Sequence, residues 1–478
     1  MENIIAQTLV AMQGEILKTI QKVGLGNIGK TAEALLDILK EGTCNLLTNL
    51  LEATDQEIAK ARSMRKADGL KVKERNVSRT ITTSLGEITY HRTYYETGEG
   101  ERVYLIDHLI GVEPYERISR ELCAKLVNLA ADLSYAKSAE VSQAEVSRQT
   151  VCNKVIGLKE VVTEVKRVEK TPKELHIFTD EDHVHLNGGK SVMVPIATIS
   201  EGIDTSDPKR HKLINPLHIA GYGMNGETFN DQVEACLNER YDINAVEKIY
   251  IHGDGAARIV SLGEVFPNAC HVLDGFHLEK YLKKLGHYEG ASQRMGALRN
   301  ALKAGNWDTY KKLLTDIISL QSDKDREKCK KIADYLWNNR EAAHLRCDEN
   351  ICGSCTESIV SHVLSERLSR SPFSWSEPGL AKMAMLRVYR KNGNQIVADD
   401  IRVSVSKEDK QQDLNSLSNG WKKYNNYMNR QIDSILSVDY SELFDKHSFS
   451  FGKVDASFVI RKALGSLARL SDSPPRTA

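Results

Sequence analysis

The chain has 478 residues, too many for one ordinary hydrophobic core, and its hydrophobic fraction of 41% is enough for roughly two to four globular domains. No stretch approaches the ~18 apolar residues of a membrane span, the start lacks the features of a signal peptide, and the nine cysteines have no secretory context, so we expect a cytoplasmic protein without membrane contact. Lys plus Arg and Asp plus Glu balance at 65 each, which argues against a simple basic protein that coats DNA.

Residues 1–78 are predicted to be mainly helical, because apolar residues recur at helical spacing from Ile4 to Ile20 and again from Ala32 to Leu51. Lys60–Arg79 holds eight basic residues against Asp68 and Glu74. This local excess is the best electrostatic candidate for contact with DNA phosphates, although a solvated helix face and loop is the alternative for such a charge run. The residues proposed to bind DNA here are Lys71, Lys73 and Arg75.

Residues 79–115 are predicted to form a β-hairpin and a linker. Arg79–Thr83 and Glu87–Tyr95 alternate in polarity, and Ser84-Leu85-Gly86 between them suits a turn.

Residues 116–170 are predicted to be helical and to contain a candidate helix-turn-helix. A helix starting at Leu133-Ser134-Tyr135 is followed by a second one within Glu145–Val155, capped by Ser147. In a helix-turn-helix the second helix enters the major groove of DNA, where Arg, Gln and Asn suit the base edges. Two packed helices without a DNA role are the alternative. The candidate reading side chains are Arg148, Gln149, Asn153 and Lys154.

Thr171–Leu186 is predicted to be a strand that ends in a turn at Asn187-Gly188-Gly189. Because side chains alternate along a strand, Asp180 and Asp182 share one face with apolar neighbours. Buried carboxylates are costly unless they are paired, hydrogen-bonded or bound to a cation, so the pair is either structural or functional. The residues on this face are Phe178, Asp180, Asp182, Val184 and Leu186.

The order of the strands and helices that follow indicates a fold. The rest of residues 171–277 is predicted to contain, in this order, strands at Ser191–Ser200 and Leu213–Tyr222, a helix, a strand at Val246–His252, a helix and a strand at Ala269–Leu273. Three strands, helix, strand, helix, strand is the order of the ribonuclease-H-like α/β fold. The first and fourth strands are neighbours in that fold, so Asp180 and Asp254 are expected to converge. Glycines on both sides of Asp254 leave room for close approach to an ion.

Residues 278–350 carry helical periodicity, and a loop of that length without structure would be improbable, so an all-helical insertion is predicted, with Trp307 and Trp337 as candidates for stacking on DNA or for filling its core. Residues 351–392 contain the helix of Glu357 and a further helix, and residues 393–478 form a C-terminal region. Cys347, Cys352 and Cys355 could be drawn as a zinc site with a nearby histidine, but only one Cys-x2-Cys pair is present, so incidental cysteines are the favoured interpretation.

Three segments resemble a known family. T-D-E-D-H-V-H-L resembles the first-aspartate strand of bacterial insertion-sequence transposases. H-G-D-G-A-A-R-I with F-P-N-A-C-H-V-L-D-G-F-H resembles the second-aspartate block of Mutator-like transposases, and G-S-C-T-E-S-I-V-S-H-V-L-S-E-R-L resembles their third-carboxylate helix. The whole is similar to the transposases of ISLre-type insertion sequences, long catalogued as an uncharacterised protein family.

This resemblance implies a DDE transposase with Asp180, Asp254 and Glu357 as catalytic metal ligands. Two Mg²⁺ ions, or Mn²⁺ in their place, suit such oxygen ligands. Asp182 is the reserve for the first aspartate. His277, oriented by Asp274, is a candidate for positioning phosphate, although a purely structural pair is nearly as well supported. The implied partners are double-stranded DNA, as terminal inverted repeats and target DNA, and further copies of the chain assembled on it.

Two other classes of protein are compatible with the sequence. A ribonuclease-H-like nuclease or resolvase without strand transfer would share the three carboxylates, but it would need neither the N-terminal DNA-binding region nor the insertion. A domesticated DNA-binding regulator would be expected to have lost a carboxylate, and all three are present. The sequence specifies neither the terminal sequence, the target site, the transposition pathway nor the oligomeric state.

Overall fold

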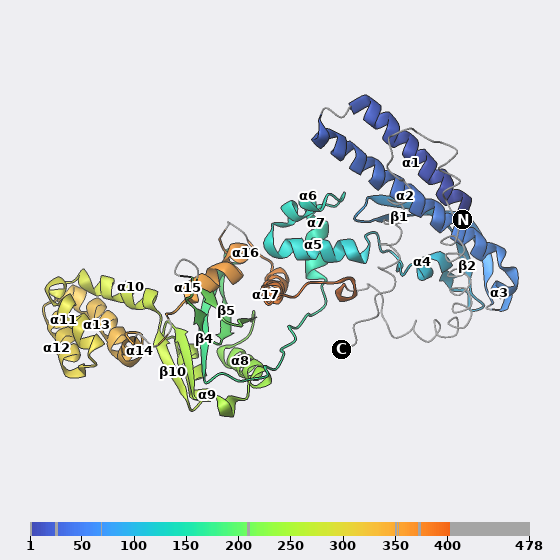
Figure 1. Cartoon of the computed structure of the whole chain (residues 1–478). Coiled ribbons are helices and arrows are strands. Elements are labelled where there is room, and N and C mark those ends of the chain that lie inside the picture. Colours follow the sequence, from blue (N-terminus) through green and yellow to red (C-terminus); the bar gives the residue numbers. More distant parts are fainter. Residues whose placement is uncertain are drawn as a thin grey trace. The chain divides into compact units, whose positions relative to one another are not determined.

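The computed structural model describes residues 2–23, 27–67, 69–207, 211–348, 351, 353–370 and 374–401. They fall into two compact units (Figure 1), of which the first comprises residues up to 79 with 89–113, and the second 80–88 with 114 onward. The C-terminal region expected at 393–478 therefore lies outside the described residues from 402. Among the described helices, none is both long and apolar enough to cross a membrane.

The first unit combines a helical hairpin with most of a small sheet, as the sequence predicts. Helices α1 and α2 pack side by side, and the strands lie in the order β1-β2-β3. Buried Asp107 on α4 accepts a 2.7 Å hydrogen bond from the Tyr90 hydroxyl and pairs with Arg92, which fixes α4 to β2. The elements are α1 (Glu2–Val23), α2 (Ile28–Lys60), α3 (Arg62–Ala67), α4 (Leu105–Leu109), β1 (Lys71–Thr82), β2 (Glu87–Glu96) and β3 (Arg102–Val103).

The first strand of the hairpin begins at Lys71, well before the predicted Arg79. Of the eight basic residues, those at the C-terminal end of the run therefore lie on a strand (Lys71, Lys73, Arg75 and Arg79), whereas the others belong to helices α2 and α3 (Lys60, Arg62, Arg65 and Lys66). The cause is local, because Asn76 has a positive φ of 58°, as at the extra residue of a β-bulge. Such a residue shifts the alternation of inward and outward side chains between Val72 and Val77, so the sequence does not display a regular strand pattern there.

The second unit is built on a five-stranded sheet whose strands lie in the order β10-β9-β4-β5-β8. β5 is antiparallel to β4 and to β8, whereas β9 is parallel to β4 and to β10. The predicted strand at 213–222 is interrupted near Asn215, whose φ is 46°, so its start pairs separately in a two-stranded ribbon. The sheet strands are β4 (Glu174–His185), β5 (Ser191–Ser200), β8 (Leu217–Ala220), β9 (Lys248–Gly253) and β10 (Ala269–Leu273), and the ribbon strands are β6 (Ile203–Asp204) and β7 (Lys212–Leu213).

Two hydrophobic cores cover the two faces of this sheet. Ile177 and its neighbours face α8 (Gly226–Arg240) and α9 (Ala257–Val265). On the opposite face, Phe178, Val184 and Leu186 share one core with the helices that precede β4 and with those that follow residue 355. The predicted common face of β4 is thus confirmed. The helices before β4 are α5 (Arg120–Asp132), α6 (Tyr135–Ser142) and α7 (Arg148–Ile156), and they belong to the core of the sheet although the sequence suggested a separate region at 116–170.

The insertion predicted at 278–350 is helical and has a hydrophobic core of its own. Figure 1 shows its helices, drawn yellow to orange, grouped together. They are α10 (Gly275–Gly286), α11 (Ala291–Lys303), α12 (Trp307–Ser319), α13 (Asp323–Asn338) and α14 (Arg340–Leu345).

The helix that carries Glu357 is not a single α-helix. It starts as α15 (Thr356–Ile359), widens into the π-helix η2 (Val360–Ser365) and ends as α16 (Glu366–Leu368). The further predicted helix is α17 (Glu377–Lys391). A π-helix is uncommon and is often found beside functional sites, where surrounding contacts compensate its altered backbone pattern.

Candidate active site

Three aspartates meet at one edge of the sheet because three neighbouring strands run parallel. Phe178 on β4 pairs with His252 on β9, so Asp180 and Asp254 lie two residues further along adjacent strands. Asp274 follows β10, and its backbone N–H donates a 2.8 Å hydrogen bond to the Gly253 carbonyl. The structure thus brings together the two aspartates that were expected to converge.

The Asp180 carboxylate makes no ion pair with the described residues, although His277 lies near it. The pKa of Asp180 is raised to about 6, mainly by burial and then by the charges of Glu181 and Asp254, against a backbone hydrogen bond from Glu181 and a weaker contribution from His277. Desolvation together with like charges disfavours the ionised form. A perturbed carboxylate at a sheet edge is a functional-site candidate on physical grounds.

Asp254 is held by its own loop. Its carboxylate accepts a 2.9 Å hydrogen bond from the Ala256 N–H, and Gly255 has a φ of 82°, which favours glycine. A Cβ at Gly255 would collide with the Asn339 side chain, and one at Gly253 would collide with Ile259. The space beside these glycines is therefore filled by protein, which corrects the idea that it admits an ion.

His277 and Asp274 form the predicted pair, with His277 Nδ1 3.3 Å from Asp274 Oδ2. The hydrogen bond with Asp274 raises the pKa of His277, and the charges of Asp254 and Asp180 add to this effect. Burial alone would raise the pKa of Asp274, but hydrogen bonds with His277 and Ser354 lower it overall. Ser354, which the sequence did not single out, lies near Asp274 just before Glu357, and its hydroxyl oxygen is 2.6 Å from that of Thr356.

Glu357 does not join the two aspartates in this structure. Thr356, Ile359 and Val360 are buried toward the sheet, so the phase of the helix leaves Glu357 exposed on the first turn of α15. Among the described residues, no three His, Cys, Asp or Glu side chains form a group that could hold a metal ion. The predicted ligand set of Asp180, Asp254 and Glu357 is therefore not assembled here, although α15 packs beside β4.

The described cysteines of the candidate zinc site likewise form no group that could hold a metal ion with other described residues. Cys347 and Cys355 are free thiols, and Cys352 lies outside the described residues.

Asp182, the reserve for the first aspartate, is occupied by structural contacts. Only 5% of the residue is exposed, and its Oδ1 accepts hydrogen bonds from Ser365 (3.0 Å) and Ser369 (2.8 Å). These hydroxyls come from the end of η2 and from the residue after α16. Asp182 thus fastens the widened helix to β4, which favours Asp180 as the first aspartate.

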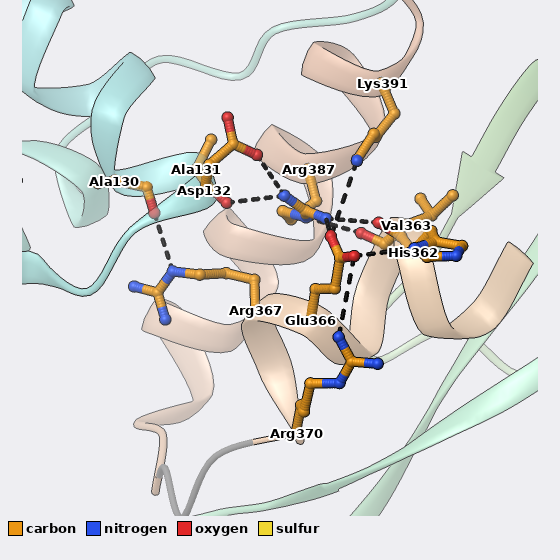
Figure 2. Close-up of polar contacts among 10 residues, drawn as sticks. All are labelled: Ala130, Ala131, Asp132, His362, Val363, Glu366, Arg367, Arg370, Arg387 and Lys391. Atoms are coloured by element: carbon orange, nitrogen blue, oxygen red, sulfur yellow. Dashed lines mark hydrogen bonds and ion pairs between the residues drawn. The ribbon is translucent and has the colours of Figure 1, made fainter. Parts of the chain in front are cut away.

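Two buried arginines tie the same helix to α5 (Figure 2). The Arg387 guanidinium donates to the carbonyls of Ala131, His362 and Val363, and to the carboxylates of Asp132 (2.5 Å) and Glu366 (3.4 Å). Arg367 donates to the Ala130 carbonyl (2.9 Å). The last carbonyls of a helix have no partner within it, so the arginines complete the end of α5 as well as the π-helix.

The candidate recognition helix begins at the predicted cap. The Ser147 hydroxyl accepts a 3.1 Å hydrogen bond from the Thr150 N–H and begins α7. Three of the four candidate reading residues are exposed, and Lys154 is half-buried. The Gln149 side-chain amide donates to Asn153 Oδ1 (2.9 Å) on the same face, next to Arg148.

The basic residues of β1 differ from one another in their partners. Lys73 pairs with Glu96 at 2.9 Å. Lys71 and Arg75 are exposed, and neither takes part in an ion pair within the described part of the chain.

The helical insertion touches the aspartate edge. The Tyr335 hydroxyl donates a 2.6 Å hydrogen bond to the Asp254 carbonyl, and the Arg346 guanidinium lies against Gly275, the residue after Asp274. Arg346 makes no ion pair with any described residue. The two tryptophans are half-buried against the core of the insertion and contact cations: the Arg340 guanidinium lies 4.3 Å from the ring centre of Trp337 and 5.8 Å from that of Trp307.

Comparison with known proteins places the chain in a family. The model of the uncharacterised protein family UPF0236 matches residues 26–403. The chain belongs to this family. A UPF0236 protein of Caldanaerobacter subterraneus subsp. tengcongensis is 36% identical over 405 residues, which cover 83% of this chain and 85% of the relative. The name of that one relative joins eleven locus designations.

Two further relatives are similar over comparable lengths. A second protein of the same organism is 34% identical over 405 residues, covering 83% of this chain and 85% of the relative, and its name joins four locus designations. A UPF0236 protein of Streptococcus gallolyticus, named for its position in the vanSb 3′ region, is 26% identical over 408 residues, covering 81% of this chain and 87% of the relative.

Proposed function

We propose that this UPF0236 member is a DDE-type transposase of ISLre-type insertion sequences, which cuts DNA strands at element ends and joins them to a target. The observation that carries the proposal is the meeting of Asp180, two residues beyond the parallel pairing of β4 with β9, and Asp254, which directly follows β9, with the pKa of Asp180 raised to about 6. Two neighbouring carboxylates that make no ion pair within the described residues are a suitable start for a divalent-metal site.

The strand arrangement supports a ribonuclease-H-like fold for residues 174–273. Three antiparallel strands are extended by two parallel ones that join beside the first, in the order β10-β9-β4-β5-β8. That is the arrangement expected of the fold, in which the first and fourth strands carry the catalytic aspartates. The helical insertion follows the last strand, at the place that the resemblance to Mutator-like transposases implies.

Asp180 and Asp254 are proposed to hold Mg²⁺, or Mn²⁺, through their carboxylate oxygens. Bound divalent ions supply an activated attacking oxygen and charge stabilisation for the leaving oxygen in phosphoryl transfer. The two aspartates fit this role, but the ligand set is incomplete without Glu357. We assign Glu357 as the third ligand because it lies on α15, which packs beside β4, the strand of Asp180.

His277 and Arg346 are proposed to contact the phosphates of the DNA. The pKa of His277 is raised by Asp274, so the ring carries positive charge over a wider pH range beside the two aspartates. Arg346 places a guanidinium against Gly275 at the same edge. A planar guanidinium suits bidentate binding of phosphate.

The relatives supply an independent argument. One protein name that covers eleven loci of a single genome is expected of a gene that has been copied to many positions. A second name that covers four loci repeats the pattern. A mobile element is the simplest source of such copies, and the chain is at least 34% identical to both proteins.

Double-stranded DNA is the proposed partner, as terminal inverted repeats and target DNA, with several copies of the chain assembled on it. In this proposal α7 reads the element ends through Arg148, Gln149, Asn153 and Lys154, and the basic residues of β1 contact the backbone.

An excision assay tests the proposal. A plasmid carrying the gene between its own genomic flanks is introduced into cells, and loss of the segment is measured by sequencing across the junction. We expect Asp180→Asn, Asp254→Asn and Glu357→Gln each to lower excision by at least about a thousandfold, because ligands of a metal that stabilises the transition state are removed. Glu174→Gln, an exposed carboxylate at the other end of β4, is the matched control and should excise normally.

The exposed position of Glu357 favours a second candidate, a DNA-binding regulator without strand transfer. Wild-type protein that binds the flanks but never excises them would support this candidate. Normal excision by Asp180→Asn would refute the transposase proposal.

A further inference from the structure

The end of helix α13 in the insertion grips the loop that carries Asp254. The Tyr335 hydroxyl donates a 2.6 Å hydrogen bond to the Asp254 carbonyl. Asn339, one helical turn further on, packs against Gly255 and donates a 3.0 Å hydrogen bond to the Tyr335 carbonyl. The Tyr335 ring stacks on Tyr281 of α10, with 3.7 Å between ring centres, so the hydroxyl is held from two helices.

Support from outside the loop matters because glycine restricts the backbone less than other residues do. Glycines flank Asp254 on both sides, and Gly255 adopts a φ of 82°. Within the loop, the Asp254 carboxylate accepts from Ala256, and the Gly253 carbonyl accepts from Asp274. The Asp254 carbonyl itself is held by Tyr335.

We propose that Tyr335 is a positioning residue, through which the helical insertion sets the place of the second aspartate. The assignment rests on the proposed metal-binding role of Asp254. Tyr335 does not touch the reacting atoms; it fixes the backbone from which the carboxylate projects. A ligand misplaced by a fraction of an ångström weakens metal binding and catalysis, which explains why a lobe outside the sheet reaches back to this loop.

The variant that tests this is Tyr335→Phe, which keeps the ring and its stacking on Tyr281 and removes the hydroxyl. Tyr310→Phe is the matched control. Tyr310 lies fully buried in the same lobe, and its hydroxyl has no hydrogen-bond partner among the described residues. Three properties are measured on the purified full chain: the melting temperature, the affinity for Mn²⁺ alone from the electron paramagnetic resonance signal of the free ion, and the Mg²⁺ concentration that gives half-maximal strand cleavage.

We expect Tyr335→Phe to weaken Mn²⁺ binding about twofold to tenfold, the range that the loss of one hydrogen bond gives, and to raise the half-maximal Mg²⁺ concentration by a similar factor. Saturating Mg²⁺ should restore most of the cleavage rate. In an Asp254→Asn background the same change should have no further effect on Mn²⁺ affinity, because the positioned ligand is already lost. Tyr310→Phe should match the wild type in both metal measurements.

The outcomes separate this inference from the proposed function. Wild-type metal affinity and Mg²⁺ dependence in Tyr335→Phe would overturn the positioning role while the transposase proposal stands. A lowered melting temperature with unchanged metal affinity would also overturn it, since it shows a purely structural hydroxyl. Normal cleavage and Mn²⁺ binding by Asp254→Asn would instead refute the proposed metal site itself.

Discussion

Two charged clusters in the second unit have opposite electrostatic characters. Arg387 is 1% exposed, yet its guanidinium is surrounded by three carbonyls and two carboxylates (Figure 2). Asp180 lies beside two other carboxylates, and the pKa of its side chain is raised to about 6. A buried charge whose partners are all present serves to stabilise the fold. A buried charge without an ion-pair partner is costly, and it is tolerated where a ligand will supply the opposite charge.

The largest expected effect on stability comes from removing Arg387, the buried charge whose partners are all present. Arg387→Met leaves the Asp132 carboxylate without its cation and removes one of several cations from Glu366, and it leaves the carbonyls of Ala131, His362 and Val363 without a donor. We expect the free energy of unfolding to fall by about 3 to 5 kcal/mol, because three carbonyls inside the protein lose their hydrogen-bond donor.

Urea titration measures this effect. Arg370→Ala is the control, because Arg370 is exposed and lies 4.0 Å from the same Glu366. It should change stability by no more than about 0.5 kcal/mol. Equal effects of the two variants would mean that burial does not distinguish these arginines.

Removing the charge of Asp180 should raise the stability of the protein, whereas removing that of Arg387 should lower it. The pKa of Asp180 in the folded protein, about 6, lies above the ordinary value of 3.8. The folded state therefore holds a proton that the unfolded state has lost, and stability falls as the pH rises through this window. Asp180→Asn removes the penalty, and we expect it to stabilise the protein at pH 8 by roughly 1 to 2 kcal/mol after allowance for solvent screening, with no gain at pH 3.5.

Thermal unfolding at both pH values, with and without Mg²⁺, makes the test sharper. Mg²⁺ should raise the melting temperature of the wild type at pH 8 and leave Asp180→Asn unchanged. A wild type that Mg²⁺ does not stabilise would show that the uncompensated charge is not a cation site.

The contrast also shows what the sequence could and could not predict. The convergence of Asp180 and Asp254 depends on alternation within one strand and on the order of neighbouring strands, and both are local patterns that a sequence displays. The exposed position of Glu357 depends on the phase of a helix interrupted by a π-turn. The same helix is fixed to β4 by Ser365 and Ser369, which bind Asp182 across more than a hundred residues, a contact that no local pattern records.

The contacts that the sequence missed are of the same long-range kind. Arg387 joins α5 to the Glu357 helix, and Tyr335 joins the insertion to Asp254. An arginine or tyrosine on an amphipathic helix looks ordinary in sequence, because its partner is defined only by the packing of distant elements. The positive φ of Asn76 is the local exception, because it conceals the part of β1 that precedes Arg79.

Smaller effects are expected among the exposed cations of β1. Lys73 is already paired with Glu96, whereas Lys71 and Arg75 have no ion pair among the described residues. If they bind DNA phosphates, Lys71→Ala and Arg75→Ala should each reduce the slope of log affinity against log salt by about 0.9, and Lys73→Ala should reduce it less. Band-shift titrations at several salt concentrations measure these slopes. Identical slopes for all three variants would show that ion pairing within the strand does not matter.

Asp182 shares features with both Arg387 and Asp180, so it gives the finest test of the comparison. Its Oδ1 accepts from two serine hydroxyls, as a structural carboxylate does, but its Oδ2 is buried without a partner among the described residues. Burial, opposed by the hydrogen bonds from Ser369 and Ser365, raises the pKa of Asp182.

If the serine contacts define its role, Ser369→Ala should lower the free energy of unfolding by about 1 kcal/mol, the usual value of one hydrogen bond, and leave the Mg²⁺ dependence of cleavage unchanged. Denaturant titration and cleavage assays on the same variant decide the matter. A stable Ser369→Ala protein with altered Mg²⁺ dependence would instead move Asp182 from the satisfied group to the metal site. In that case the Oδ2 of Asp182 would be the metal-binding oxygen, in place of the Asp180 carboxylate.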